Sequence, residues 1–351
     1  MTDLPTLGLT PPDLVTAAAE RGLVMAAGEA RRVLAELISH GRPDLSGMRR
    51  PVRGTLRVAL EGALDVTRPT VLERVEDPDD GSLRYLFRLG DGAVVEAVRI
   101  PLKAAARFSV CLSSQVGCAM KCAFCATGRL GLERHLTAHE IIGCFLQVRD
   151  EAPGRVTGAV FMGQGEPLHN YDAVIQAAQV LAHPCGGRIS AKAISISTVG
   201  IVPRIHQFAE EGHKFRLVVS LTSADPTRRR ALMPVAGKWS LDELAASIRA
   251  LHAAQGRRIT VAWVLMSGVN TGADEADALK ALLPDVPIRV NLIDVNDARP
   301  TGFVRASAPE RDAFIDALQV LQMPIVRRFS VGQGRDSACG MLASRRQEAR
   351  P

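Results

Sequence analysis

The 351-residue sequence predicts an α/β fold, a partial (β/α)6-type barrel like a TIM barrel, with a small α+β domain at its N-terminus. From about residue 107 onward, apolar or β-branched runs of strand length alternate with helical patterns, which is typical of a parallel sheet with helical crossovers. Six or seven such units favour an incomplete barrel over a flat doubly wound sheet. Before that point the pattern consists of short helices and a small sheet.

The N-terminal region begins with two short helical patterns, at 11–19 and 27–38. Three strand patterns with a period of two follow, at 70–75, 83–89 and 93–100. A Gly-Asp-Gly turn between the last two strands is a strong hairpin signal. These elements predict a small helical unit that leads into a small sheet.

The larger region consists of predicted strands and helices in alternation. The strands cover 108–112, 156–162, 193–198, 215–221, 259–265, 288–293 and 325–329. The helical patterns between most of them cover 138–148, 172–181, 241–253, 274–282 and 309–321. We therefore expect residues 1–100 to form an accessory unit, 104–334 the core and 335–351 a tail. Barrels of this kind place their active sites at the carboxyl ends of the strands.

Composition and charge narrow the class of protein. Of the 43 basic residues only six are lysine, and the net charge is +6. Arginine suits phosphate recognition, so a basic surface for nucleic acid is one interpretation, and genome-wide preference for arginine is the other. Seven cysteines without framework spacing indicate a reducing compartment. With no signal-peptide pattern and no apolar run of about 20 residues, we expect a cytoplasmic protein without a membrane partner.

Cys118, Cys122 and Cys125 form a tight loop with gaps of three and two residues. Thiolates this close can hold three corners of one metal centre. A structural zinc site, or a complete four-iron cluster in an electron carrier, would need a fourth ligand, and none follows nearby. A cluster with an open iron can bind a small chelating ligand. The alternative is three incidental or buried thiols.

Two carboxylates near predicted strand ends are further candidates. Glu166 lies in a Gly-Gln-Gly-Glu-Pro turn directly after a strand, where glycines permit close approach and the carboxylate can accept from an ammonium group. Glu96 shares a strand face with Val94, Val98 and Ile100. Burial among apolar side chains would favour its protonated form and make it a usable general base, whereas the alternative is a simple strand-edge charge.

The cysteine loop and the Gly-Glu-Pro turn one strand later resemble the radical S-adenosylmethionine (SAM) superfamily. More closely, residues 113–118, 161–171 and 338–340 resemble the RlmN/Cfr family of RNA methyltransferases, over about residues 96–342. The resemblance implies a radical SAM barrel and a four-iron, four-sulfur [4Fe-4S] cluster held by Cys118, Cys122 and Cys125. It also implies SAM contacts at the strand ends, namely Gly165, Glu166, Ser197, Ser220, Leu221, Thr222 and Asn296.

The resemblance also implies a reaction. Cys339 matches the methyl-carrying cysteine, Cys111 its resolving partner and Glu96 the acid/base position. Two SAM molecules are used per turnover, one to methylate Cys339 and one to generate a radical, and C2 or C8 of an adenosine in ribosomal RNA (23S) or transfer RNA receives the methyl group. A disulfide between Cys111 and Cys339 then remains. Flavodoxin or ferredoxin is the expected electron donor, and a monomer is expected. We interpret Cys144 and Cys185 as core and loop thiols.

Three departures from the family pattern concern the substrate: Thr222 replaces a usual His, the 297–302 loop differs from the usual one, and Met341 replaces a usual Gln. For RNA contacts, the run at 228–230 and the pair at 327–328 are better candidates than the earlier arginines. Those earlier arginines are Arg31, Arg32, Arg49, Arg50 and Arg53.

Two other functions stay open at this point. One is a radical SAM enzyme that modifies a peptide or a small molecule. The other is a non-catalytic iron-sulfur or zinc protein that binds nucleic acid. An assay for 5′-deoxyadenosine after anaerobic reconstitution distinguishes the second from any radical SAM enzyme.

Overall fold

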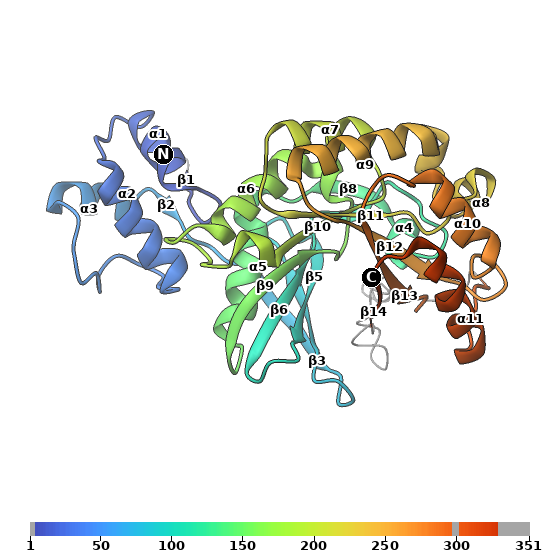
Figure 1. Cartoon of the computed structure of the whole chain (residues 1–351). Helices are drawn as coiled ribbons and strands as arrows, with labels where there is room; N and C mark the ends of the chain where they lie inside the picture. Colours follow the sequence, from blue (N-terminus) through green and yellow to red (C-terminus); the bar gives the residue numbers. More distant parts are fainter. Residues whose placement is uncertain (1–3, 297–301, 329–351) are drawn as a thin grey trace.

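The computed structural model describes residues 4–296 and 302–328 (Figure 1). The predicted tail at 335–351, with Cys339 and Met341, lies outside the described residues, as does most of the 297–302 loop. None of the described helices is both long enough and apolar enough to cross a membrane.

Within the described residues, one ten-stranded sheet has the order β14-β13-β12-β11-β10-β9-β6-β5-β4-β3. Its parallel part confirms the predicted strands, with small shifts at the ends. These strands are β6 (Arg107–Leu112), β9 (Arg155–Phe161), β10 (Ile194–Thr198), β11 (Arg216–Ser220), β12 (Ile259–Leu265), β13 (Ile288–Asp294) and β14 (Ile325–Arg328). Consecutive parallel strands are neighbours, which is the strand order of a barrel and not of a doubly wound sheet. The parallel part therefore forms the predicted partial barrel.

Helices connect the parallel strands and cover the outer face of the sheet (Figure 1). They are α5 (Ala138–Asp150), α6 (Tyr171–Ala182), α7 (Val202–Glu210), α9 (Leu241–Gln255), α10 (Ala273–Leu282) and α11 (Ala308–Leu318). Two of them begin with capping boxes, Thr137 with Glu140 and Ser240 with Glu243. Helix α7 was not predicted. Its Pro203 lies in the first turn, where the missing N–H costs no hydrogen bond.

The N-terminal region forms a helical unit at one side of the molecule, away from α10 and α11 (Figure 1). It contains β1 (Leu4–Pro5), α1 (Pro11–Ala19), α2 (Ala27–Leu34) with a π-helical turn after it (Ala35–Ser39), α3 (Gly54–Glu61) and β2 (Leu64–Asp65). The next strands, β3 (Thr70–Glu76), β4 (Leu83–Arg88) and β5 (Val94–Pro101), are antiparallel. Because β5 also pairs with β6, the predicted small sheet is continuous with the parallel sheet, and the boundary near residue 100 falls inside it.

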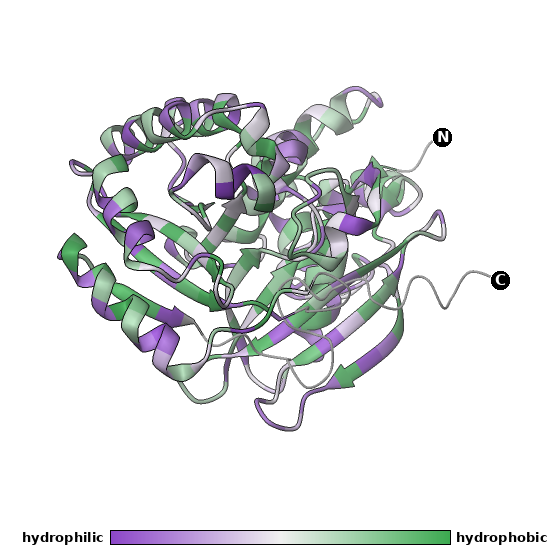
Figure 2. Ribbon diagram, turned by 90° about the vertical axis from the view of Figure 1, so that its right-hand side faces the viewer, coloured by the Kyte–Doolittle hydropathy of each residue, from purple (hydrophilic) through white to green (hydrophobic). Residues whose placement is uncertain are grey.

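The two faces of the parallel strands differ in chemistry. On the helix side, alternate residues such as Ile196, Trp263 and Leu292 are fully buried in the main core. On the concave side, β10 and β11 present Ser197 and Ser220. Figure 2 shows mostly hydrophobic residues along the strands and alternating hydrophilic and hydrophobic residues along the helices. The concave face is therefore the polar face of this sheet, on which ligands can be bound.

Candidate active site

The three-cysteine loop lies beyond the carboxyl end of β6, between the two strands of a short hairpin that the sequence did not predict. Cys118 ends β7 (Gln115–Cys118), and Cys125 directly precedes α4 (Ala126–Arg129). Strand β8 (Gly131–His135) pairs with β7 so closely that a Cβ on Gly117 would lie 2.0 Å from the Gly131 carbonyl oxygen. Glycine is therefore required immediately before the first cysteine.

The cysteines share one cavity of about 140 Å³, which we call the cysteine cavity. Cys118 and Cys122 are each only 8% exposed, and burial raises the pKa of the Cys118 thiol to about 12 and that of Cys122 well above its usual value. In the described part of the chain, no group of three or more His, Cys, Asp or Glu side chains is close enough together to hold a single metal ion. The donor set nevertheless fits an iron-sulfur cluster, because cysteines that hold three corners of a cluster do not converge on one atom.

The two sequence motifs on either side of the cavity are bound directly to each other. The main-chain N–H groups of Ser114 and Gln115 donate to the Gln164 carbonyl at 2.8 and 3.2 Å. In return, the Glu166 N–H donates to Gln115 Oε1 at 2.8 Å, and Asn170 Nδ2 donates to the Ser114 carbonyl at 2.8 Å. These contacts explain why polar residues occur at fixed positions in both motifs. They fix the glycine turn beside the cysteine loop.

Glu166 is buried, 2% exposed, and its carboxylate joins two strand ends. It accepts from the N–H of Leu168 and from the N–H of Val199, both at 2.9 Å. Burial raises the pKa of Glu166 to about 7, partly opposed by these hydrogen bonds. Gly165 has φ +101°, and a Cβ there would lie 2.6 Å from the Cβ of Gln115. The carboxylate is therefore held in a fixed place on the cavity wall.

The structure brings most of the predicted cofactor-binding residues together. Ser197 and Ser220 lie across from each other, with their Oγ atoms 3.3 Å apart. The predicted residues that line the cysteine cavity are Cys118, Cys122, Cys125, Gly165, Glu166, Ser197, Ser220 and Asn296. Five strand-end segments that are far apart in sequence thus contribute to one site.

Leu221 and Thr222, the other two predicted cofactor contacts, do not line that cavity. Leu221 packs in the main core, because it is on the helix side of the sheet. Thr222 is fully buried with φ +63°, a rare backbone conformation for a β-branched residue. Its Oγ1 has no hydrogen-bond partner within the described residues. Neither residue is therefore part of the wall of the cysteine cavity.

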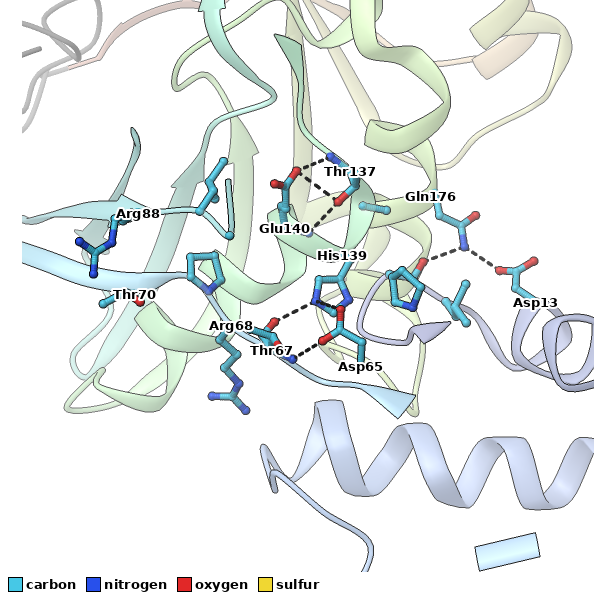
Figure 3. Close-up of a pocket in the computed structure, with 17 residues that line it drawn as sticks. Asp13, Asp65, Thr67, Arg68, Thr70, Arg88, Thr137, His139, Glu140 and Gln176 are labelled. Carbon is cyan, nitrogen blue, oxygen red and sulfur yellow. Dashed lines mark hydrogen bonds and ion pairs between the residues drawn. The ribbon is translucent and has the colours of Figure 1, made fainter. Parts of the chain in front are cut away.

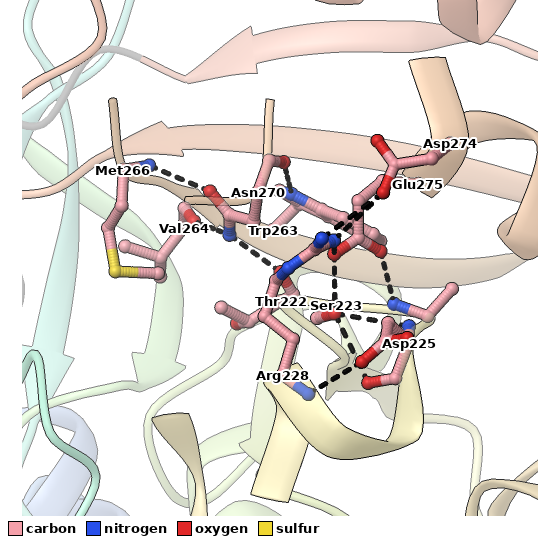
Figure 4. A network of polar contacts seen from close by, with 11 residues as sticks. Thr222, Ser223, Asp225, Arg228, Trp263, Val264, Met266, Asn270, Asp274 and Glu275 are labelled. Atoms are coloured by element: carbon pink, nitrogen blue, oxygen red, sulfur yellow. Dashed lines mark hydrogen bonds and ion pairs between the residues drawn. The ribbon is translucent and has the colours of Figure 1, made fainter. Parts of the chain in front are cut away.

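A buried polar network supports this unusual backbone (Figure 4). Asn270 Nδ2 donates to the carbonyls of Thr222 and Val264, both at 2.7 Å. Glu275, which is fully buried, accepts from Ser223 Oγ at 2.5 Å and from the Ala224 N–H at 2.7 Å. The sequence analysis missed both residues, since a single Asn or Glu in a loop or helix carries no local signal of this role.

The arginine run at 228–230 was predicted to contact RNA, and for Arg229 this prediction is wrong. Arg229 is 2% exposed and donates to the carbonyls of Ser220, Leu221 and Val199. Burial lowers the pKa of its guanidinium to about 10. Arg228 pairs with the buried carboxylate of Glu275. Only Arg230 of this run is exposed.

Other arginines predicted to contact RNA also have protein partners. Arg327 lies 3.7 Å from the Asp294 carboxylate, and Arg53 forms an ion pair with Glu29 at 2.9 Å. The loop that follows the π-helical turn after α2 places Arg49 and Arg50 on the surface. These two remain candidates for contacts with a nucleic acid.

Glu96 and Cys111 lie on neighbouring strands of the concave face, next to the cysteine cavity but not on its wall. Cys111 pairs across β5 and β9 with Val98 and Val160 and packs against them and Met162, which lines the cavity. Glu96 was predicted to be surrounded by apolar side chains, but a charged side chain also contacts it. It forms a fully buried ion pair with Arg84 at 2.7 Å, because β4 places that guanidinium beside it.

The predicted pairing of Cys111 with Cys339 involves a residue outside the described range. No disulfide joins any two of the six cysteines that the structure describes. Cys144 is fully buried in α5, and Cys185 is a partly buried loop thiol, as predicted.

A second and larger cavity, of about 710 Å³, lies between the N-terminal unit, α5, α6 and the hairpin of β3 and β4 (Figure 3). Its polar groups largely bind one another: His139 Nε2 contacts the Thr67 carbonyl at 2.8 Å, and Gln176 donates to Asp13 at 2.6 Å. None of the three loop cysteines lines it. Size alone therefore does not identify the site of chemistry in this protein.

Comparison with known proteins agrees with this geometry. Residues 112–279 match the model of the Radical SAM superfamily. A probable RNA methyltransferase from Anaeromyxobacter sp. (strain Fw109-5) is 51% identical, over 90% of this chain and 93% of the relative. A probable dual-specificity RNA methyltransferase RlmN from Synechococcus sp. is 40% identical, over 82% of each chain.

One solved structure has the same overall architecture. The crystal structure of a radical SAM methyltransferase from Sphaerobacter thermophilus matches with a TM-score of 0.88 and 33% identity, over 98% of this chain and 99% of the other. The chain therefore belongs to the radical SAM superfamily, whose cofactors are a [4Fe-4S] cluster and SAM, and within it to the RlmN-type RNA methyltransferases.

Proposed function

We propose that this protein methylates C2 or C8 of an adenosine in ribosomal or transfer RNA, through a methyl group carried by Cys339. Glu96 acts as the proton acceptor, and Cys111 releases the product. The names of its relatives support an RNA substrate. A reducing protein such as flavodoxin or ferredoxin supplies electrons, and the enzyme acts as a monomer.

The position of Glu96 and Cys111 is the observation that carries this proposal. Both lie on the concave face beside the cysteine cavity, although neither residue lines it. A protein that only stored a cluster has no use for a thiol and a carboxylate at this place. The buried ion pair with Arg84 at 2.7 Å holds the Glu96 carboxylate in place on this strand.

The residues of the cysteine cavity divide the remaining work. Cys118, Cys122 and Cys125 hold the cluster, and the bound cluster with SAM supplies the one-electron chemistry that starts the reaction. Glu166 accepts a hydrogen bond from the SAM ammonium group, while the Oγ atoms of Ser197 and Ser220 bind polar groups of the same ligand. Phe124 and Met233 exclude water from the cavity wall.

After the carbon carried by Cys339 has bonded to the base, the radical adduct would return one electron to the bound redox cofactor, and Glu96 would remove the proton from the substituted base carbon. The Cys111 thiolate then attacks the Cys339 sulfur and the carbon–sulfur bond breaks. Its electron pair stays with the carbon on the base, which takes up a proton and becomes the methyl group. A disulfide remains, and external reduction restores both thiols. Each turnover therefore consumes two electrons for the disulfide, while the electron used to cleave SAM is returned by the adduct.

The test compares RNA from cells with and without this gene by mass spectrometry of adenosine derivatives. We expect a methyladenosine, with the methyl group on C2 or C8, only when the gene is present. Cys339→Ala should keep its cluster, seen by absorption and iron content after anaerobic reconstitution, yet transfer no methyl group. Cys185→Ala is the matched control and should behave as wild type. Full turnover by Cys339→Ala would refute the cysteine relay.

A further inference from the structure

The amino ends of β11, β12 and β13 enclose a cavity of about 170 Å³, at the opposite end of the strands from the cysteine cavity. Four arginines line it: Arg216, Arg257, Arg258 and Arg289. No acidic residue of the described chain contributes to its wall. We call it the arginine cavity.

The register of the sheet explains how these arginines meet. Arg216 pairs with Ser195, and Arg289 pairs with Thr260, which is two residues from Arg258. Paired residues of a parallel ladder point to the same face, here the concave face that also carries Ser197. Strand pairing therefore brings Arg216 and Arg289 beside the consecutive pair Arg257 and Arg258.

The charges of the arginine cavity are not neutralised by any carboxylate in the part of the chain that the structure describes. Among the described residues, no carboxylate lies within ion-pair distance of any of the four guanidinium groups, and Arg289 Nε is buried without a hydrogen-bond partner. Arg249 pairs with Asp285 at 2.9 Å, and Arg74 pairs with Glu151 at 2.5 Å, so ion pairing is common elsewhere. Burial, and then the positive charge of Arg216, lower the pKa of Arg257.

One guanidinium is fixed in place, while two others have no internal hydrogen bonds. Arg257 donates to the carbonyls of Phe215 and Lys214 and to Gln255 Oε1 at 2.8 Å. Arg216 and Arg258 are exposed, and their guanidinium groups form no hydrogen bond with another described residue. A partly preorganised group of cations with unused donors is arranged for a multivalent anion.

We propose that the arginine cavity binds a phosphate group, either a backbone phosphate of the RNA substrate or a free phosphate compound. A phosphate offers several acceptor oxygens and more than one arginine can bind it at once. The cavity exceeds the volume of a water molecule, about 30 Å³, several-fold. The RNA source rests on the proposed function, whereas the phosphate chemistry does not.

The first measurement uses inorganic pyrophosphate and the thermal stability of the full chain. At constant ionic strength, pyrophosphate should raise the Tm of the wild type and have no effect on Arg216→Gln/Arg258→Gln. The matched control is Arg74→Gln/Arg249→Gln, which removes two surface guanidiniums that form ion pairs, and it should respond like the wild type. Arg289→Gln provides a second variant and should weaken the response in the same direction.

The second measurement uses fluorescein-labelled oligouridine and fluorescence anisotropy at several salt concentrations. If the phosphate belongs to RNA, Arg216→Gln/Arg258→Gln should bind about tenfold more weakly. The slope of log affinity against log salt should also become shallower, by about one for each phosphate that the variant no longer binds. The control variant should keep the wild-type slope.

The outcomes separate the two sources. An abolished pyrophosphate response with weakened RNA binding assigns the site to the RNA backbone. An abolished response with unchanged RNA binding assigns it to a free phosphate compound. Unchanged responses to both probes in both variants overturn the proposal. Neither measurement needs methyl transfer, so an absent methyladenosine in cells would refute the proposed function and leave this site standing.

Discussion

At the carboxyl ends of the parallel strands, buried charged groups bind partners within the chain, whereas at the amino ends four guanidiniums face a cavity to which no described carboxylate contributes. Glu166 and Arg229 each bind main-chain groups of two or more strand ends. The guanidiniums of Arg216 and Arg258 bind no described residue. A site that performs chemistry needs groups fixed before the substrate arrives. A site that binds a charged chain needs charged groups without an ion-pair partner, and the solvent screens these charges until the ligand binds.

The largest effect is expected at the cysteine loop. Cys118→Ala should reduce the iron content after anaerobic reconstitution to background and abolish formation of 5′-deoxyadenosine, because two thiolates cannot hold the cluster. Cys144→Ala should keep both, since Cys144 is a core thiol of α5. A wild-type iron content in Cys118→Ala would show that the cluster is bound elsewhere.

The next largest effect is expected from Arg229→Met, which should lower the free energy of unfolding. It leaves three strand-end carbonyls without a donor, and at roughly 1–3 kcal/mol for each buried group we expect a loss of about 4 kcal/mol in the free energy of unfolding. Arg230→Met, at the exposed neighbouring position, should change it by less than about 0.5 kcal/mol. Urea denaturation measures both. Equal small effects would contradict the role given to the buried guanidinium.

Glu166 should give the cofactor-free protein a pH-dependent stability. Its pKa is about 7 in the folded chain against 4.5 when exposed, so the folded state binds the proton more tightly. The stability is highest below about pH 4.5 and falls as the pH rises to about 7. At about 1.4 kcal/mol for each pH unit, the loss is about 3 kcal/mol. Denaturation of Glu166→Gln over the same range should lack this loss, and an identical slope in both proteins would refute it.

The smallest effect is expected at the arginine cavity. Arg216→Gln removes a positive charge that repels Arg257, so without phosphate the Tm should rise slightly, by a few tenths of a kcal/mol in free energy. Differential scanning calorimetry at low salt measures the change, and high salt should remove it. A clear drop in Tm would mean that Arg216 has a stabilising role in the chain.

Most of the fold could be predicted because local patterns decide it. The strands at 156–162 and 259–265 are rich in apolar and β-branched residues, and each lies within one residue of the observed strand. Helix α8 (Pro226–Leu232) and the hairpin of β7 and β8 were missed, because they are too short for a periodic pattern. The continuity of the antiparallel strands with the barrel depends on the pairing of β5 with β6, which no local pattern encodes.

Local sequence is sufficient to specify the alternation of strands and helices, the three-cysteine loop and the turn that carries Glu166, since each depends on residues close together in the chain. Long-range packing decides that Arg229 supports strand ends while Arg216 and Arg289 meet at a cavity. Ion pairing joins residues of different elements, Glu96 with Arg84 across the hairpin of β4 and β5, and Arg228 with Glu275 between α8 and α10. Whether a charge is fixed, paired or available to a ligand depends on those neighbours.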